Sequence, residues 1–425
     1  MDELVEWKDS KNRKPLIFRG VRQCGKTYLL KEFASKYYED YIYLNFEKNP
    51  NYCSIFEKDL EPSRIIIEIE VLTGKKIIPN KTLIIFDEIQ TCKKAVTSLK
   101  YFCEEKPEIH IASAGSLIGI SLSKPESYPV GKVDIKYLYP MSFVEFLYAN
   151  EEKRLVEYID GKKDIYSISD AVRDKMENYL KYYFIVGGMP EAVNSWIENK
   201  DVERVENIQD NILQMYQLDF AKHAPEKDLR KISQIWKSIP EQLAKENSRF
   251  IFGHVRKGAR AKDLEDALNW LIDSGMVYKI EKIEKPYIPL SAYSKSNQFK
   301  IYTCDIGLLR KLAGIDAKVV ISKNSKYTEF KGALTENYAL TELINKGCKN
   351  VYFWRSKNTA EVDFVIQYNG DPTPVEVKSG NNTKSKSLIT YIKKYDVKKA
   401  FRFSLDKRKN KEVIEEMPLY FIWKI

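Results

Sequence analysis

The sequence predicts an α/β protein that is divided into several domains. Residues 15 to about 150 alternate short, apolar, β-rich runs with helix-length segments, a pattern typical of a mostly parallel sheet covered by helices. The 425 residues exceed the roughly 250 to 300 at which a single core stops growing, so about two to four domains are expected. A hydrophobic share of 44% and a charged share of 31% exclude general disorder.

The first predicted domain, residues 1–150, contains a glycine-rich loop between a strand and a helix. Residues 20–27 read Gly-Val-Arg-Gln-Cys-Gly-Lys-Thr, which satisfies the P-loop pattern G-x-x-x-x-G-K-[ST]. Gly20 and Gly25 let backbone N–H groups curl around phosphates. Lys26 is expected to reach the β- and γ-phosphates, and Thr27 to supply a hydroxyl ligand to Mg²⁺. The loop therefore predicts binding of ATP with Mg²⁺. The predicted strands of this domain are 16–18, 41–46, 83–86 and 109–112.

The run 83–86 leads directly into two carboxylates, Asp87 and Glu88. An acidic residue at the end of a second buried strand is the usual partner of a P-loop. We expect Asp87 to hold the Mg²⁺ shell, and Glu88 to orient or deprotonate the water that attacks ATP. The pair predicts hydrolysis as well as binding.

A further strand, 109–112, runs into Ser113-Ala114-Gly115-Ser116. These small polar residues are expected at the carboxyl edge of the sheet, beside the γ-phosphate. Ser113 or Ser116 is predicted to sense that phosphate, and we assign Ser116 to the catalytic set. A tight turn of small residues is the alternative.

The middle of the chain is predicted to be helical and then mixed. Residues 151–225 are expected to form a helical lid, interrupted by the breaker Gly-Gly-Met-Pro at 187–190. Residues 226–320 show helices, including 263–274, followed by strand-like segments, which predicts a winged helix.

Basic residues gather before the helix at 263–274, namely Arg256, Lys257, Arg260 and Lys262. They could contact the phosphates of double-stranded DNA while the helix enters the major groove. The same helix carries Asp263, Glu265 and Asp266, which would repel phosphate and favour a protein partner instead. Both kinds of partner remain open.

The order of segments resembles a large prokaryotic family of ATP-binding proteins that join an AAA-type ATPase domain to a C-terminal domain known as DUF4143. Besides the P-loop, the matching segments are Phe-Asp-Glu-Ile-Gln at 86–90, Ala-Gly-Ser at 114–116, Tyr-Pro-Met-Ser-Phe-Val-Glu-Phe-Leu at 139–147, Gly-Gly-Met-Pro-Glu at 187–191 and Glu-Val-Asp-Phe at 361–364. The resemblance implies ATP binding and hydrolysis. Where the family usually has a Gly-Arg step, this chain has Gly131-Lys132, and Lys cannot reproduce the planar fork of Arg.

The last predicted domain, residues 321–425, carries a second set of charged residues. Asp363 lies on one predicted strand, Glu376-Val-Lys378 on the next, and Glu336 on a preceding helix. This order resembles the PD-(D/E)xK nuclease fold, in which Asp363 and Glu376 would ligate Mg²⁺ and Lys378 would stabilise the attacking water. Ordinary ion pairs on an exposed hairpin face are the alternative.

Composition narrows the remaining possibilities. The six cysteines and three histidines are scattered without zinc-ligand spacing, and no apolar run approaches the roughly 18 residues of a membrane span. The N-terminal residues lack the pattern of a signal peptide, so a cytoplasmic protein without membrane contact is expected. The net charge of +10 raises the odds of polyanion contact.

The function that the sequence predicts is a Mg²⁺-dependent ATPase whose nucleotide state acts on a DNA-binding or nuclease-like C-terminal region. The alternative is a nucleotide-gated switch or scaffold that does not hydrolyse ATP and carries an inert C-terminal fold. An ATP-gated nuclease is a third hypothesis. A homo-oligomer is expected because AAA-type sites often take an Arg from a neighbouring subunit.

Overall fold

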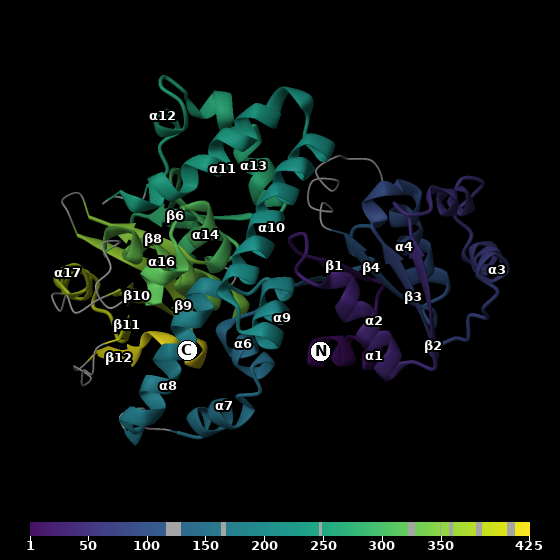
Figure 1. The fold of residues 1–425 in the computed structure, drawn as a ribbon. Coiled ribbons are helices and arrows are strands. Elements are labelled where there is room, and N and C mark those ends of the chain that lie inside the picture. The colour runs from purple at the N-terminus through teal and green to yellow at the C-terminus, as the bar shows by residue number, and fades with distance from the viewer. Residues whose placement is uncertain are drawn as a thin grey trace. The chain divides into compact units, whose positions relative to one another are not determined.

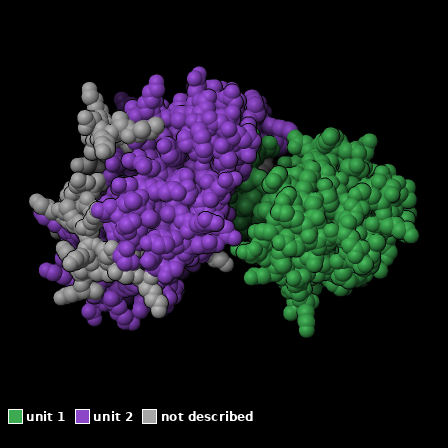
Figure 2. Space-filling model, turned by 60° about the horizontal axis from the view of Figure 1, so that its bottom comes forward, with its two compact units in different colours: residues 1–139, 273–275 green, residues 140–272, 276–425 purple. Residues whose placement is uncertain are grey.

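The computed structural model describes residues 1–115, 129–162, 167–245, 249–321, 328–348, 350–356, 360–379, 385–405 and 413–425. These residues form two units, coloured separately in Figure 2. Unit 1 contains Met1–Tyr139 and Asp273–Gly275, and unit 2 contains Pro140–Ile272 and Met276–Ile425. The α/β class predicted from the sequence is confirmed, since each unit has its own sheet.

Unit 1 is a five-stranded sheet in the order β2-β3-β4-β1-β5, and all its neighbouring strands are parallel (Figure 1). Its elements are α1 (Asp2–Asp9), β1 (Leu16–Arg19), α2 (Lys26–Tyr37), β2 (Asp40–Asn45), η1 (Pro50–Phe56), α3 (Pro62–Thr73), β3 (Thr82–Asp87), η2 (Ile89–Thr91), α4 (Lys93–Glu105), β4 (His110–Gly115) and β5 (Asp134–Tyr137). Because the strands are parallel, the ends of β1, β3 and β4 meet at one edge, where ligands bind in such sheets.

Two hydrophobic cores cover the two faces of this sheet. On one face, side chains of α1 and α2 such as Trp7 and Phe33 pack on Leu16 and Ile85. On the other face, η1, α3 and α4 pack on alternate strand residues such as Ile84. Burial on both faces explains why β3 and β4 are buried at every position, as the continuous apolar runs in the sequence predict.

Unit 2 combines a helical layer with a seven-stranded mixed sheet. Its helices are α6 (Phe143–Ala149), α7 (Lys153–Asp160), α8 (Asp170–Val186), α9 (Pro190–Asn199), α10 (Val202–His223), η4 (Glu226–Asp228), α11 (Leu229–Ala244), α12 (Phe252–Val255), α13 (Ala261–Asp273), η5 (Leu290–Tyr293), α14 (Ile306–Leu312), α15 (Ala317–Ile321), α16 (Thr328–Asn345), α17 (Lys386–Tyr395) and η6 (Leu419–Lys424). None of the helices in the described parts of the chain is both long and apolar enough to cross a membrane.

The sheet of unit 2 has the order β12-β11-β10-β9-β8-β6-β7. Its strands are β6 (Val277–Ile283), β7 (Ser294–Thr303), β8 (Tyr352–Arg355), β9 (Glu361–Tyr368), β10 (Asp371–Val377), β11 (Ala400–Ser404) and β12 (Ile414–Pro418). β6 pairs antiparallel with β7 and parallel with β8, so the hairpin continues the sheet of the C-terminal strands. Segments expected as separate domains, 226–320 and 321–425, therefore share one sheet. Helix α13 is followed by the β6–β7 hairpin, which is the order of elements expected of a winged helix. The assignment of a winged helix stays a prediction.

The Gly-Gly-Met-Pro breaker separates α8 from α9, and Gly188 has a packing reason to lack a side chain. The Gly188 oxygen accepts a hydrogen bond from the Met141 nitrogen at 2.7 Å, and a Cβ at Gly188 would lie 2.1 Å from the Met141 oxygen. The Gly188 nitrogen donates to Asp305 Oδ2 at 2.6 Å. This motif joins three segments of unit 2.

The Pro-Met-Ser-Phe segment at 140–143 leads into α6 and links this helix to α16 within unit 2. Ser142 and Glu145 form a reciprocal capping box. The Phe143 nitrogen donates to Glu342 Oε1 of α16 at 2.9 Å. Burial raises the pKa of Glu342 to about 8, even though this hydrogen bond acts in the opposite direction.

Candidate functional site

The P-loop lies between β1 and α2, and its backbone bends tightly enough to require glycine. Gly25 has φ 91°, a conformation that L side chains rarely adopt, and it immediately precedes α2. A Cβ at Gly20 would lie 2.2 Å from the Leu138 oxygen. The loop therefore presents backbone N–H groups at the start of α2, as a phosphate-binding loop does.

Lys26 is the first residue of α2 and is only 8% exposed. Its Nζ donates to the Gly20 oxygen at 2.9 Å and to the Val21 oxygen at 2.7 Å. The ammonium group is thus folded over the loop by two backbone carbonyls. Phosphate oxygens can replace these acceptors without leaving the buried charge unpaired.

Thr27 and Asp87 meet at the carboxyl edge of the sheet. Thr27 Oγ1 donates toward the Asp87 carboxylate, at 3.1 Å from Oδ1 and 3.2 Å from Oδ2. Asp87 is the last residue of β3 and is 4% exposed. The two residues expected to hold Mg²⁺ are therefore adjacent, although 60 positions separate them in the sequence.

Two residues of β2 complete the surroundings of Asp87, and the sequence analysis did not single them out. Tyr43 donates its hydroxyl to Asp87 Oδ2 at 2.5 Å, and Asn45 Nδ2 donates to the same oxygen at 3.1 Å. Burial, together with this hydrogen bond, raises the pKa of Tyr43 to about 12, so the hydroxyl remains a donor. The available signal was the two-residue spacing of Tyr43 and Asn45 on a strand that ends beside Asp87.

Glu88 has a different environment from Asp87. Its φ of 50° lies in the left-handed region, so the chain turns sharply after β3. Its Oε2 accepts a hydrogen bond from Gln90 Nε2 at 2.5 Å. The half-buried Glu88 carboxylate is held by Gln90 and is not part of the hydrogen bonds around Asp87.

The third strand contributes Ser113, which is fully buried in β4 between β1 and β3. Its hydroxyl has no hydrogen-bond partner in the described part of the chain. Ser116, which was assigned to the catalytic set, lies outside the described residues.

The predicted C-terminal residues come together in unit 2. Asp363 of β9 and Glu376 of β10 are 9% and 2% exposed, respectively. Asp363 Oδ2 accepts from the Val377 nitrogen at 2.7 Å, and Lys378 Nζ lies 3.1 Å from Glu376 Oε1. Burial, and then the charge of Glu336, raise the pKa of Asp363 to about 7. The charges of Asp363 and Glu376 raise the pKa of Lys378 against the opposing effect of burial.

Two residues of β7 contact the carboxylates of this region and were missed in the sequence analysis. Tyr302 donates its hydroxyl to Glu336 Oε2 at 2.9 Å. Lys300 Nζ lies 3.5 Å from the same oxygen and 2.5 Å from Glu361 Oε1. We call Lys300, Glu336, Glu361, Asp363, Glu376 and Lys378 the carboxylate–lysine cluster. The one feature of the sequence that could have indicated these two residues is the alternate placing of a lysine and a tyrosine on a buried strand.

The two sites differ in the side chains that surround the carboxylates expected to ligate a metal ion. Thr27 and Asp87 fit Mg²⁺, because in nucleotide sites that ion takes most of its ligands from phosphate and water. In the carboxylate–lysine cluster, lysines adjoin the carboxylates. Among the residues that the structure describes, no three His, Cys, Asp or Glu side chains are grouped so that they could hold a metal ion. The Mg²⁺ ligation expected of Asp363 and Glu376 stays a prediction.

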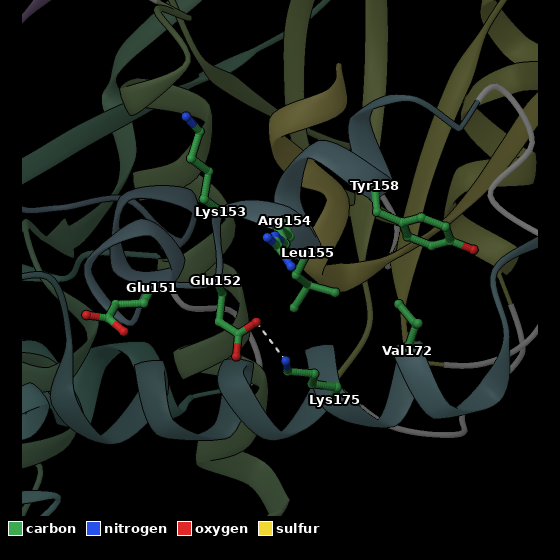
Figure 3. Close-up of a pocket in the computed structure, with 8 residues that line it drawn as sticks. All are labelled: Glu151, Glu152, Lys153, Arg154, Leu155, Tyr158, Val172 and Lys175. Carbon is green, nitrogen blue, oxygen red and sulfur yellow. Dashed lines mark hydrogen bonds and ion pairs between the residues drawn. The ribbon is translucent and has the colours of Figure 1, made fainter.

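A surface pocket of about 620 Å³ lies beside α7 and α8 (Figure 3). Its lining residues are Glu151, Glu152, Lys153, Arg154, Leu155, Tyr158, Val172 and Lys175. Glu152 accepts from Lys175 Nζ at 2.7 Å and from the Tyr179 hydroxyl at 2.6 Å. The Glu152 carboxylate is already paired, and none of the predicted site residues lines the pocket. The pocket is therefore not the candidate site.

The P-loop, the Asp87 carboxylate and the parallel strand order define a P-loop nucleotide-binding domain. Family models match this chain at an AAA domain over residues 12–147 and at two domains of unknown function, DUF8612 over 177–319 and DUF4143 over 331–421. The chain is an AAA-type protein with a C-terminal DUF4143 domain, as the resemblance in the sequence implied.

The similar curated proteins are themselves uncharacterized. One from Mycobacterium bovis is 36% identical over 80 residues, which span 19% of this chain and 17% of that protein. One from Methanocaldococcus jannaschii is 25% identical over 369 residues, 85% of this chain and 74% of that protein. Among solved structures, C. elegans PCH-2 is 14% identical with a TM-score of 0.26, over 45% of this chain and 56% of that one. Cdc6p from Pyrobaculum aerophilum is 12% identical with a TM-score of 0.26, over 75% and 90% of the two chains.

Proposed function

We propose that unit 1 binds ATP with Mg²⁺ and hydrolyses it, and that the nucleotide state acts on a partner-binding region of unit 2. The observation that carries the proposal is the meeting of Thr27 and Asp87 at 3.1 Å, next to the P-loop that holds Lys26. The match to the AAA domain over residues 12–147 supports it. ATP is the substrate, and Mg²⁺ is the metal cofactor.

In this proposal each residue has one task. Lys26 exchanges the carbonyls of Gly20 and Val21 for phosphate oxygens, and the N–H groups of the loop bind the same phosphates. Thr27 and Asp87 hold Mg²⁺, while Tyr43 and Asn45 orient the Asp87 carboxylate. Bound Mg²⁺ supplies positive charge to the phosphates during transfer.

Glu88 is the proposed general base. Its carboxylate accepts a proton from, or orients, the attacking water. Gln90 fixes the direction of this carboxylate through the 2.5 Å hydrogen bond. Ser113 has a buried hydroxyl free to bond beside β1 and β3, which supports a role as phosphate sensor, and Ser116 stays a prediction.

The proposal is tested by measuring nucleotide binding and phosphate release separately. Lys26→Ala should lose ATP binding, because the variant lacks the ammonium group that is expected to bind the β- and γ-phosphates. Glu88→Gln should bind ATP and lose turnover by about 10²-fold or more, the usual scale for a general base. Glu105→Gln changes an exposed residue of α4 and should leave both unchanged. Binding by wild-type protein without turnover would favour the non-hydrolysing switch instead.

Double-stranded DNA is the proposed partner of unit 2. Arg256, Lys257, Arg260 and Lys262 are all exposed around the start of α13. Asp263, one of the three acids expected to repel phosphate, lies in the first turn of α13, where its Oδ2 accepts from the Arg260 nitrogen at 2.9 Å. A protein partner, favoured by the exposed Glu265 and Asp266, is the alternative.

A further inference from the structure

Lys300 is a completely buried ammonium group on β7, and its position is set by carboxylates from two other elements. Its side chain is 0% exposed, and its Nζ lies 2.5 Å from Glu361 Oε1 of β9 and 3.5 Å from Glu336 Oε2 of α16. A lysine is almost never fully buried unless it is paired. The pairing with Glu336 and Glu361 is therefore built into the fold of unit 2.

The carboxylates of the cluster already have donors from the chain itself. Glu336 accepts from the Tyr302 hydroxyl, and Glu361 also lies 3.8 Å from Arg355. Asp363 accepts from the Val377 nitrogen, and Glu376 pairs with Lys378. Among the carboxylate oxygens of the cluster, all of which belong to described residues, Glu376 Oε2 is the one that is buried without a partner.

We propose that Lys300 is the resident cation of the carboxylate–lysine cluster, and that its ammonium group closes the cluster to divalent metal ions. A metal ion on Glu336 or Glu361 would have to share their oxygens with this ammonium. A metal ion on Asp363 would lie within reach of the same positive charge, and like charges in a buried site repel strongly. The carboxylate–lysine cluster thus keeps the residue order of a PD-(D/E)xK site. Lys300, from the β6–β7 hairpin, supplies its positive charge in place of a metal ion.

The consequence for function is specific. The carboxylate–lysine cluster does not bind the metal ion that cleavage of DNA by a metal-dependent route would need, and the hairpin that supplies Lys300 stabilises the contact between β7, β9 and α16. This inference is independent of ATP hydrolysis, because it concerns residues of unit 2 alone.

The test is Mn²⁺ binding to the full-length protein without nucleotide, in an Asp87→Asn background that disables the nucleotide site. Electron paramagnetic resonance separates free from bound Mn²⁺, and calorimetry gives the stoichiometry. With Lys300 present, we expect no saturable Mn²⁺ site. Lys300→Met should gain one site per chain, and that site should disappear again in Lys300→Met/Asp363→Asn.

Two results would overturn the proposal. The first is a saturable Mn²⁺ site in protein that retains Lys300, if Asp363→Asn removes it. The second is a folded Lys300→Met protein, as judged by circular dichroism, that binds no Mn²⁺. If Lys300→Met does not fold, Lys300→Gln takes its place, and the first measurement decides without any change at Lys300.

Discussion

At the scale of single residues, Asp87 is the buried carboxylate that our proposal assigns to Mg²⁺. Three side chains from two other elements, Thr27, Tyr43 and Asn45, donate to its oxygens. Such donors fix the orientation of a ligand and are typical of the surroundings of metal sites. The position of Asp87 in this proposal therefore depends on β2 as well as on the P-loop.

Glu342 is a second buried carboxylate, and it makes the stability of the protein depend on pH. Burial raises its pKa from 4.5 to about 8, so the folded state holds a proton that the unfolded state releases over this interval. The free energy of unfolding should therefore fall as pH rises from about 4.5 to 8, by up to about 1.4 kcal/mol per pH unit.

Glu342→Gln should remove this part of the pH dependence, because an amide does not titrate and its oxygen can still accept from Phe143. Urea unfolding of both proteins across this pH range measures the difference. An identical pH dependence in the two proteins would show that Glu342 is ionised in the folded state.

The sequence could predict the residues around the P-loop because each lies within a short contiguous motif. Lys26 and Thr27 follow Gly25 directly, and Asp87 ends an apolar run. Lys300 could not be predicted in the same way, because its partners Glu336 and Glu361 are 36 and 61 positions away and on other elements. Their contact follows from the pairing of the strands, which no local pattern fixes.

At the scale of elements, hydrophobic periodicity was enough to place most strands. The predicted runs 16–18 and 83–86 lie within β1 and β3, and the helix expected to carry Glu336 is α16. The boundaries differ by a few residues because tertiary packing decides where strands and helices end. The pairing of β6 with β8 was missed, since a hairpin carries no local signal for its third neighbour.

Gly188 gives a prediction about the joint between α8, α9 and α6. Gly188→Ala should destabilise the protein by about 3 kcal/mol or more, because the new Cβ would meet backbone atoms that cannot move aside. Gly332→Ala is the matched control, since no atom lies within 4 Å of a Cβ there and alanine favours the helix. Equal urea midpoints for Gly188→Ala and wild type would contradict this packing.

At the scale of the whole molecule, the structure divides the chain at Tyr139/Pro140, close to the end of the matched AAA domain at residue 147. The segment predicted as a helical lid lies in unit 2 together with the C-terminal sheet. The match to DUF8612 over 177–319 likewise crosses residue 225, where a boundary was expected. A homo-oligomer remains a prediction.

Binding of double-stranded DNA by unit 2 has a distinctive dependence on salt. Neutralised phosphates release counterions, so log Kd against log salt should become shallower by about 2 when Arg256 and Lys257 are both changed to Ala. Lys227→Ala/Lys237→Ala removes the same charge from exposed positions outside the basic cluster and should leave the slope unchanged. Equal slopes for the two double variants would instead direct the search toward a protein partner.

The central claim is that Thr27, Asp87, Lys26 and Glu88 form an ATP-hydrolysing site. Phosphate release from ATP and Mg²⁺ by the full-length protein, with and without double-stranded DNA and beside Glu88→Gln, tests it most directly. We expect turnover in the wild type that Glu88→Gln abolishes without loss of ATP binding. Equal turnover in both proteins would contradict the assignment of Glu88, and the absence of turnover in the wild type under both conditions would contradict hydrolysis itself.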